Sequence, residues 1–303
     1  SGATCRCATG FHAVAPFAAV RCRGALTMAH PSTPSGRSLQ RSDPGYESAR
    51  HAAVLCTIVP QRSPGPIVAA ISIDAVVSAA SGAKAEGRKV SVRSGGHSWS
   101  ANHVRDDGVL IDVSRLQSFT VDKAAMTATA EPGIGGSVLL AELMKRGLFF
   151  PVGHCRGVCI GGYLLQGGFG WNGRLLGPAC ASVIGIDYVD AEGDLRHASE
   201  TENAEMLWAA RGAGPDFFGV VVRFHLRVYR KPGFVGTSVL QYPVERLDDL
   251  VGWMCEVGPD VPPQVELQFL ISRSPSLPPP MRARTGTSPV RIEVAVPTFA
   301  ESR

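Results

Sequence analysis

Apolar and polar positions alternate in short runs along the middle of the chain. Runs rich in valine, isoleucine and threonine, each bounded by turn-forming residues, predict strands, and apolar residues at helical spacing predict helices. The strands are expected at 66–71, 89–93, 109–112, 119–121 and 126–131, and the helices at 74–86 and 137–145.

The same kind of pattern resumes after a glycine-rich stretch. Two apolar runs on either side of Glu192-Gly193 predict a hairpin with a two-residue turn. Leu207 and Trp208 lie at helix spacing and are expected to pack in the core. Strands and helices that follow one another without regular βαβ alternation are typical of the α+β class. The elements expected here are strands at 183–191 and 194–198, a helix at 203–211 and a strand at 220–229.

The two ends of the chain lack such periodicity. Residues 1–42 are rich in Ser, Arg, Ala and Pro, and we expect them to be disordered. At the other end, strands at 235–242 and 264–271 flank a helix at 244–256. Residues 274–303 then form a Pro-rich tail that is expected to be irregular.

Charge is concentrated near the N-terminus. The formal net charge is +4, and residues 1–50 hold six arginines against two acidic residues, so the rest of the chain is neutral overall. Nucleic-acid binding needs a basic stripe on the folded part, so no such partner is expected. The apolar run 11–20 resembles a signal or transit peptide, but Arg21 and Arg23 follow it, whereas a secretory signal places its charges first. A natural start at Met28 fits the sequence equally well.

The composition is that of a globular enzyme domain. The chain has 303 residues, of which 45% are hydrophobic and 18% charged, enough for a sizeable core in one or two domains. Apolar stretches end well short of the roughly 20 residues of a transmembrane helix, so no membrane partner is expected. The eight cysteines are irregularly spaced, which argues against a disulfide framework and leaves the compartment open.

One apolar run ends at a glycine pair followed by a histidine. The segment Val90-Ser91-Val92-Arg93-Ser94-Gly95-Gly96-His97-Ser98 is typical of a strand that delivers a loop against a phosphate. Glycines let the backbone approach an anion and point successive N–H groups at it. The alternative is a tight turn with a solvated imidazole.

A second segment is denser still in glycine. Pro151-Val152-Gly153-His154-Cys155 runs on through Gly157, Gly161, Gly162, Gly167, Gly168 and Gly170 with few charges. Each glycine inside a helix or strand costs about 0.5–1 kcal/mol relative to alanine, so the cluster indicates backbone packed against something flat or bulky. A planar cofactor is the obvious candidate, and Tyr163, Gln166 and Asn172 are polar side chains that either face it or pack within the loop.

Three other interpretations of these residues are weaker. Gly168, Gly170 and Gly173 spell the dinucleotide fingerprint G-x-G-x-x-G, but they follow no clear strand and precede no amphipathic helix. Gly96 to Ser100 approaches the G-x-S-x-G elbow of serine hydrolases, but its last glycine is a serine. His154, Cys155 and Cys159 lack a second pair of ligands at zinc-site spacing, so we predict no metal.

In order along the chain, five motifs resemble those of the berberine-bridge-enzyme-like FAD-linked oxidases, within the vanillyl-alcohol oxidase/p-cresol methylhydroxylase (PCMH) superfamily. The resemblance covers residues 43–272, and five ordered motifs are far more specific than any one of them. The motifs are Asp43-Pro44-Gly45-Tyr46, Arg93 to Ser98, Gly153-His154-Cys155 with Gly161 to Gly168, Leu207 to Gly212, and Phe218-Gly219-Val220-Val221.

The resemblance implies a fold and a set of site residues. It assigns residues 43–230 to a PCMH-type FAD-binding domain of two α+β subdomains, and 231–273 to the start of an antiparallel-sheet substrate domain. It implies FAD bonded to His97 at the flavin 8α-methyl carbon and to Cys155 at ring position 6. The implied cofactor-binding residues are Arg93, Ser94, Gly95, Gly96, His97, Ser98, Gly153, His154, Cys155, Gly157, Gly161, Gly162, Gly167, Gly168, Val220 and Val222.

The function implied by the resemblance is oxidation of a C–H bond next to oxygen or nitrogen in a small-molecule substrate. Hydride passes to flavin N5, and dioxygen is the expected acceptor; a dehydrogenase with another acceptor is an alternative. Family members continue through more of the substrate sheet, so the chain resembles a C-terminally truncated member and no catalytic base is assigned. A second alternative is therefore a flavin-binding remnant without turnover, whose exposed sheet edge would promote association.

Overall fold

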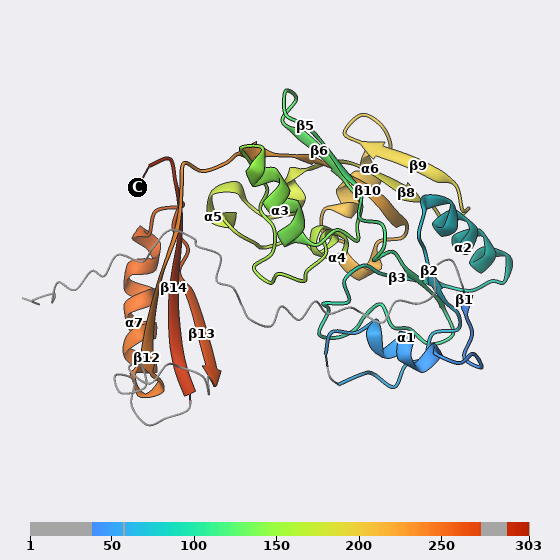
Figure 1. The fold of residues 1–303 in the computed structure, drawn as a ribbon, viewed down its shortest axis with the longest axis horizontal. Coiled ribbons are helices and arrows are strands. Elements are labelled where there is room, and N and C mark those ends of the chain that lie inside the picture. Colours follow the sequence, from blue (N-terminus) through green and yellow to red (C-terminus); the bar gives the residue numbers. More distant parts are fainter. Residues whose placement is uncertain (1–37, 57, 274–289, 303) are drawn as a thin grey trace, which may run out of the picture. The chain divides into compact units, whose positions relative to one another are not determined.

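The computed structural model describes residues 38–56, 58–273 and 290–302. The described residues up to Lys231 form one compact unit, and those from Pro232 onward form another (Figure 1). Most of the disorder predicted for 1–42 lies outside the described residues. The described end of that range is ordered, because Ser38–Leu39 form a strand and the Leu39 side chain is buried.

The first unit begins with a four-stranded sheet, here called sheet 1, in the order β1-β2-β4-β3. Strands β2, β4 and β3 are parallel, and β1 is antiparallel to β2. Helix α1 packs on one face through Tyr46 and Ala49, and α2 packs on the other through Val76 and Ala80. The elements are β1 (Ser38–Leu39), α1 (Tyr46–Ala52), β2 (Ile67–Ala69), α2 (Ile73–Ala85), β3 (Val90–Arg93) and β4 (Val109–Asp112).

Sheet 2 is antiparallel, with five strands in the order β5-β6-β10-β8-β9. One face carries the largest core of the described residues, in which Leu139, Leu164 and Phe224 are fully buried. The alternation of Thr and Ala in β6 places Ala128 and Ala130 on this buried face, as a half-buried strand requires. The elements are β5 (Phe119–Asp122), β6 (Thr127–Ala130), α3 (Gly136–Lys145), α4 (Ile160–Leu165), α5 (Gly173–Leu176), β8 (Val183–Val189), β9 (Leu195–Ser199), α6 (Ala204–Ala210) and β10 (Val220–Arg227). The short strands β7 (Leu148–Phe149) and β11 (Tyr229–Arg230) pair with each other.

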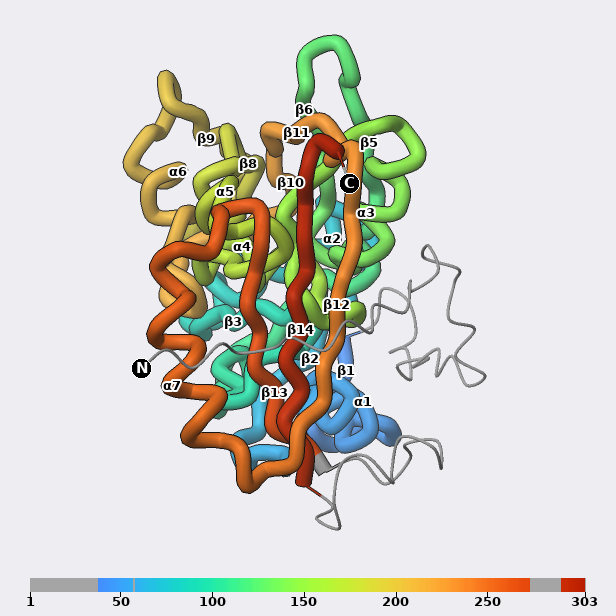
Figure 2. The backbone as a smooth tube through the Cα atoms, turned by 90° about the vertical axis from the view of Figure 1, so that its left-hand side faces the viewer, coloured from blue at the N-terminus to red at the C-terminus, as the bar shows by residue number. Residues whose placement is uncertain are grey.

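The second unit is a three-stranded antiparallel sheet, with β14 between β12 and β13 (Figure 2). Helix α7 packs on one face through Leu250, against Ile292 and Val294 of β14. On the same sheet Leu270 and Ile271 are exposed. The elements are β12 (Phe234–Pro243), α7 (Leu247–Val257), β13 (Gln268–Arg273) and β14 (Val290–Ala300).

Two predictions need correction here. Residues 290–300 are not irregular: they form β14, which alternates buried and half-buried positions and pairs along its length with β12. The turn of the β8–β9 hairpin holds three residues (191–193) rather than two, because the Asp190 N–H donates to the Asp194 carbonyl across it; within the turn Gly193 adopts a left-handed φ of +87°. Residues 274–289 of the predicted tail lie outside the described residues.

The fold class is α+β, with a mostly parallel sheet and an antiparallel sheet in the first unit and a small antiparallel sheet in the second. No helix among the described residues is long and apolar enough to cross a membrane.

Candidate functional site

The first unit contains a cavity of about 1250 Å³. Its wall includes the residues that follow β3 and the segment around α4. Ligands of open parallel sheets bind outside the carboxyl ends of the strands, and β3 ends at Arg93, which lines this cavity together with the loop that follows it. Cavities that hold drug-sized ligands measure roughly 300–1000 Å³, so this one has room for a larger molecule.

The 94–98 loop lies directly on the chain that follows α1. Gly96 has a φ of +69°, and a Cβ at this position would collide with the carbonyl of Ala53. The Gly96 carbonyl in turn accepts a hydrogen bond of 3.0 Å from the Leu55 N–H. Only glycine permits both the conformation and the contact, which explains the glycine that the sequence places before His97.

Arg93, the last residue of β3, holds the start of this loop in place. Its guanidinium donates to the Asp112 carboxylate at 2.6 Å and to the Ala52 carbonyl at 3.2 Å, and the Arg93 side chain is 4% exposed. Arg93 and Asp112 are cross-strand partners in β3 and β4. The charge of Arg93 is therefore engaged within the fold, at the end of the strand that carries the loop.

The second glycine-rich segment interlocks with the first. The Ser94 hydroxyl accepts a hydrogen bond of 3.2 Å from the Gly162 N–H. A Cβ on Gly161 would lie 2.8 Å from the Ser94 Oγ, and a Cβ on Gly157 would lie 2.9 Å from His97 Nε2. Since real Cβ atoms almost never come so close to other atoms, glycine at both positions lets the two segments touch.

Most of the predicted site residues line this one cavity, and five do not. Val222 is fully buried in the core beneath α2, and the His154 ring packs on Trp171 with ring centroids 4.3 Å apart. The predicted residues that line the cavity are Arg93, Ser94, Gly95, Gly96, His97, Ser98, Cys155, Gly161, Gly162, Gly168 and Val220. The remaining ones, Gly153, His154, Gly157, Gly167 and Val222, lie outside its lining.

His97 and Cys155 come from different segments and reach the same cavity. Cys155 is exposed and not disulfide-bonded, and the His97 ring lies against the backbone of Gly157, two residues further along. Cys159, at the start of α4, is less exposed than Cys155, and burial raises the pKa of the Cys159 thiol. Cys155 is therefore the accessible nucleophile of this segment.

The cavity also has residues that the sequence analysis missed. His103 Nε2 lies 2.8 Å from the Ala53 carbonyl, on the chain segment that supports Gly96. Burial lowers the pKa of His103, although the hydrogen bond with Ala53 opposes this shift. Trp99, Phe169 and Phe218 line the cavity with exposed fractions of 86%, 79% and 64%. Phe218 begins the last of the five motifs, but single exposed aromatics give no periodic signal, so the sequence analysis assigned none of the three rings to the site.

Tyr163 and Gln166 also line the cavity, whereas Asn172 is buried outside it. The Tyr163 hydroxyl donates to the Pro151 carbonyl at 2.7 Å, so part of its role is to pack the glycine segment. Tyr163 also lies against Gly168, where a Cβ would meet its ring.

The weaker interpretations of these motifs do not fit the structure. Gly168 and Gly170 follow α4 rather than a strand, and Gly173 begins the four-residue α5 rather than a long helix. No helix follows Ser98, since 99–108 run as turns and loop. In the described part of the chain, His154, Cys155 and Cys159 do not group as metal ligands.

Comparison with known proteins agrees with this geometry. Residues 64–199 match the family model of an FAD binding domain. FAD-linked oxidoreductase penO of Penicillium crustosum is 36% identical over 229 residues, covering 76% of this chain and 51% of that protein. The chain thus spans about half the length of this curated relative.

Solved structures give the same result. The structure of 6-hydroxy-D-nicotine oxidase from Arthrobacter nicotinovorans superposes with a TM-score of 0.74 and 25% identity, covering 90% of this chain and 57% of that one. Berberine-bridge-enzyme-like 1 of Physcomitrella patens gives a TM-score of 0.74 and 25% identity, covering 88% and 54%.

The fold and the matched residues define a protein with a flavin-binding domain of the PCMH type. The chain has an FAD binding domain, FAD-linked oxidoreductases are its homologues, and berberine-bridge-enzyme-like proteins are among its structural neighbours.

The contact between the two glycine segments can be tested with adjacent glycines of α4. We expect Gly161→Ala to destabilise the protein, because its Cβ would overpack Ser94 and Pro132, at a cost of about 1–3 kcal/mol. Gly162→Ala is the matched control: its Cβ would meet only Gln166 at 3.9 Å, and helix propensity favours alanine by up to about 1 kcal/mol. Urea unfolding of both variants measures the difference, and equal stabilities would contradict the interlocked arrangement.

The buried imidazole of His103 predicts an acid sensitivity. Because folding lowers its pKa, the unfolded chain binds more protons, and the stability contributed by His103 is present above about pH 6.5 and is lost as the pH falls below that value. His103→Gln keeps a donor for the Ala53 carbonyl but does not titrate. We therefore expect this variant to lose less stability than the wild type when the pH is lowered. Urea unfolding at about pH 7.5 and about pH 5 measures this, and parallel pH dependences would rule it out.

Proposed function

We propose that this chain binds FAD in the cavity between its two glycine-rich segments and that the flavin is bonded to both His97 and Cys155. The observation that carries the proposal is that these two nucleophilic side chains, 58 positions apart in the sequence, line the same cavity from different segments. A neutral imidazole nitrogen and a thiolate can each add to an electrophilic flavin ring, whereas an amide or hydroxyl would not.

The residues present fit this cofactor. The cavity exceeds the volume of drug-sized ligand sites, and several of the residues that line it are glycines, which leave room for a bulky planar group. The 94–98 loop would hold one part of the cofactor, and the segment around Gly161 and Gly162 would hold another. The exposed rings of Trp99, Phe169 and Phe218 supply apolar surface of the kind that a planar molecule covers.

When bound, FAD supplies a hydride acceptor at N5 and returns the electrons to dioxygen, which would make the protein an oxidase of a small-molecule C–H bond. The task of the chain's own residues is to position the substrate, to exclude water and to stabilise charge. The Gly161 and Gly162 N–H groups already donate to the Pro132 carbonyl and the Ser94 hydroxyl, so backbone N–H groups of the 94–98 loop would be the donors for negative charge on the cofactor. The buried Arg93–Asp112 pair keeps the loop with His97 in place without offering its own charge.

The covalent attachment predicts a simple difference between variants. Acid precipitation of the purified protein releases noncovalently bound flavin and retains covalently attached flavin. We therefore expect the wild-type pellet to keep its yellow colour. His97→Ala and Cys155→Ala should each retain flavin in the pellet through the remaining bond, and the double variant should lose it. Absorbance of pellet and supernatant measures the outcome.

Cys255→Ala is the control for thiol loss, because Cys255 is also exposed but lies in the second unit. A coloured pellet from the double variant would place the bonds elsewhere. Wild-type protein that is soluble but colourless would leave a remnant that does not retain flavin.

The acceptor is tested separately. We expect the flavin of the photoreduced protein to regain its oxidised absorbance rapidly when mixed with air-saturated buffer in a stopped-flow instrument, since an oxidase passes electrons to dioxygen. Persistent reduced flavin, reoxidised only by an added quinone or dye, would mean a dehydrogenase that uses another acceptor.

A further inference from the structure

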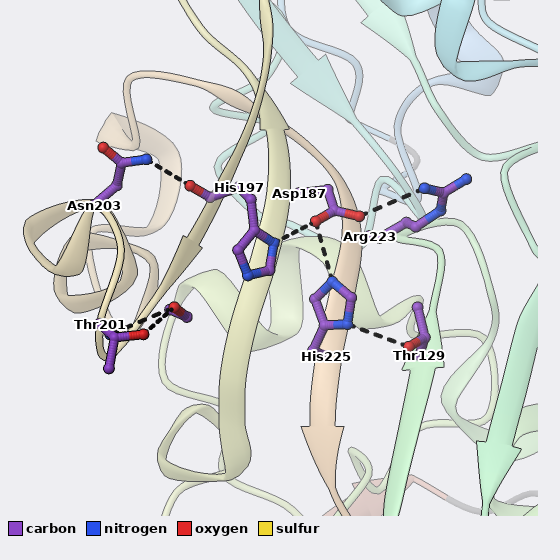
Figure 3. A network of polar contacts seen from close by, with 8 residues as sticks. Thr129, Asp187, His197, Thr201, Asn203, Arg223 and His225 are labelled. Atoms are coloured by element: carbon purple, nitrogen blue, oxygen red, sulfur yellow. Dashed lines mark hydrogen bonds and ion pairs between the residues drawn. The ribbon is translucent and has the colours of Figure 1, made fainter.

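Sheet 2 carries a polar cluster on the face opposite its main core. Asp187 of β8 lies between His197 of β9 and His225 of β10 (Figure 3). One ligand atom from each of these three residues lies within 4.8 Å of the other two. The cluster belongs to the first unit, and none of its members lines the cavity described above.

The contacts converge on one carboxylate oxygen. His197 Nδ1 lies 2.7 Å from Asp187 Oδ1, and His225 Nε2 lies 3.1 Å from the same atom. The other oxygen, Oδ2, faces the Arg223 guanidinium at 3.5 Å. Two imidazole nitrogens therefore converge on one carboxylate oxygen, while Arg223 lies at the other oxygen of the carboxylate (Figure 3).

We propose that Asp187, His197 and His225 form a site for a divalent transition-metal ion, with Zn²⁺ as the ion that this ligand set fits. Imidazole and carboxylate ligands suit Zn²⁺. Ligand atoms that bind one tetrahedral Zn²⁺ at about 2.1 Å lie about 3.4 Å apart, so small side-chain rotations bring these atoms into range. Water would complete the coordination, since the side chains of His197 and His225 are 42% and 30% exposed.

A neighbouring hydroxyl can accept a hydrogen bond from the tautomer that a metal requires. The Thr129 hydroxyl on β6 lies 3.3 Å from His225 Nδ1. Without a metal ion, Nε2 carries the proton and donates it to Asp187 Oδ1, and the Thr129 hydroxyl donates to Nδ1. With the ion bound, the proton would sit on Nδ1 and be donated to the Thr129 hydroxyl, which leaves the Nε2 lone pair for the ion. Metal-ligating histidines commonly donate their second ring N–H to such a partner.

The proposed ion would join three adjacent strands. Asp187 and His197 are cross-strand partners, and Asp187 is paired with Arg223 on β10. Val189, two residues beyond Asp187, and Val220 and Val221, at the start of β10, line the large cavity. Metal binding here would therefore fix the strands that form one wall of that cavity, independently of whether flavin is bound.

The test is a Zn²⁺ titration of the full chain by calorimetry, after the thiols have been alkylated so that cysteines cannot bind the metal. We expect one Zn²⁺ per chain, and at least a tenfold loss of affinity in His197→Ala and in His225→Ala. His51→Ala is the matched control, because His51 is an exposed histidine of the same unit whose ring lies near its helix neighbours Glu47 and Arg50 and not near the cluster. We expect its affinity to equal that of the wild type.

His197 lies on β9, an edge strand of sheet 2. We therefore expect His197→Ala to fold, and it tests the proposal even where His225→Ala fails to fold. Thermal unfolding is the second readout: Zn²⁺ should raise the Tm of the wild type and of His51→Ala but not of His197→Ala. Absorption of the Co²⁺ complex should show N/O ligation without a thiolate charge-transfer band. The proposal is overturned by the absence of saturable Zn²⁺ binding in the wild type, or by unchanged affinity in His197→Ala.

Discussion

The close approach of two backbone segments is the constraint on which the rest of the site depends. The 94–98 loop lies on the chain around Ala53 because Gly96 has no side chain, and it touches the 157–162 segment because Gly157 and Gly161 have none. The hydrogen bond from the Gly162 N–H to the Ser94 hydroxyl connects the segments directly. Without these contacts, His97 and Cys155 would have no common cavity to line.

A buried ion pair holds the start of the 94–98 loop in position. Arg93 and Asp112 are cross-strand partners at the ends of two parallel strands, and their side chains are almost entirely removed from water. Removing one partner of such a pair leaves an uncompensated buried charge and typically costs about 3–5 kcal/mol, although the intact pair adds little net stability. Arg93 thus belongs to the machinery of the site through the position of the loop rather than through its charge.

Strong local patterns were readable from the sequence. The alternation in β6 and the Ser72-capped α2 place those elements within a residue or two of their predicted bounds. Glycine-rich loops were readable as well, since each glycine reports a local need of the backbone. Features that depend on tertiary partners could not be predicted from the sequence. Trp208 sits at core spacing beside the buried Leu207 but is 80% exposed, and Val222 is a core residue rather than a cavity residue.

Residues far apart in the sequence were the hardest to predict. The strand β14 was not predicted from its own sequence, and it is defined by its pairing with β12 and β13. Asp187, His197 and His225 come together only through the register of three strands, so no spacing in the sequence marks them. His103 becomes part of the site through its contact with Ala53, 50 positions earlier.

Peptide mass spectrometry of the flavin-loaded, protease-digested protein tests the central claim most directly. If the two glycine segments form one FAD site, a single species will contain the peptide with His97, the peptide with Cys155 and one flavin that joins them. Flavin recovered on neither peptide, or bonded to a residue outside the 94–98 and 153–162 segments, would contradict the site described here.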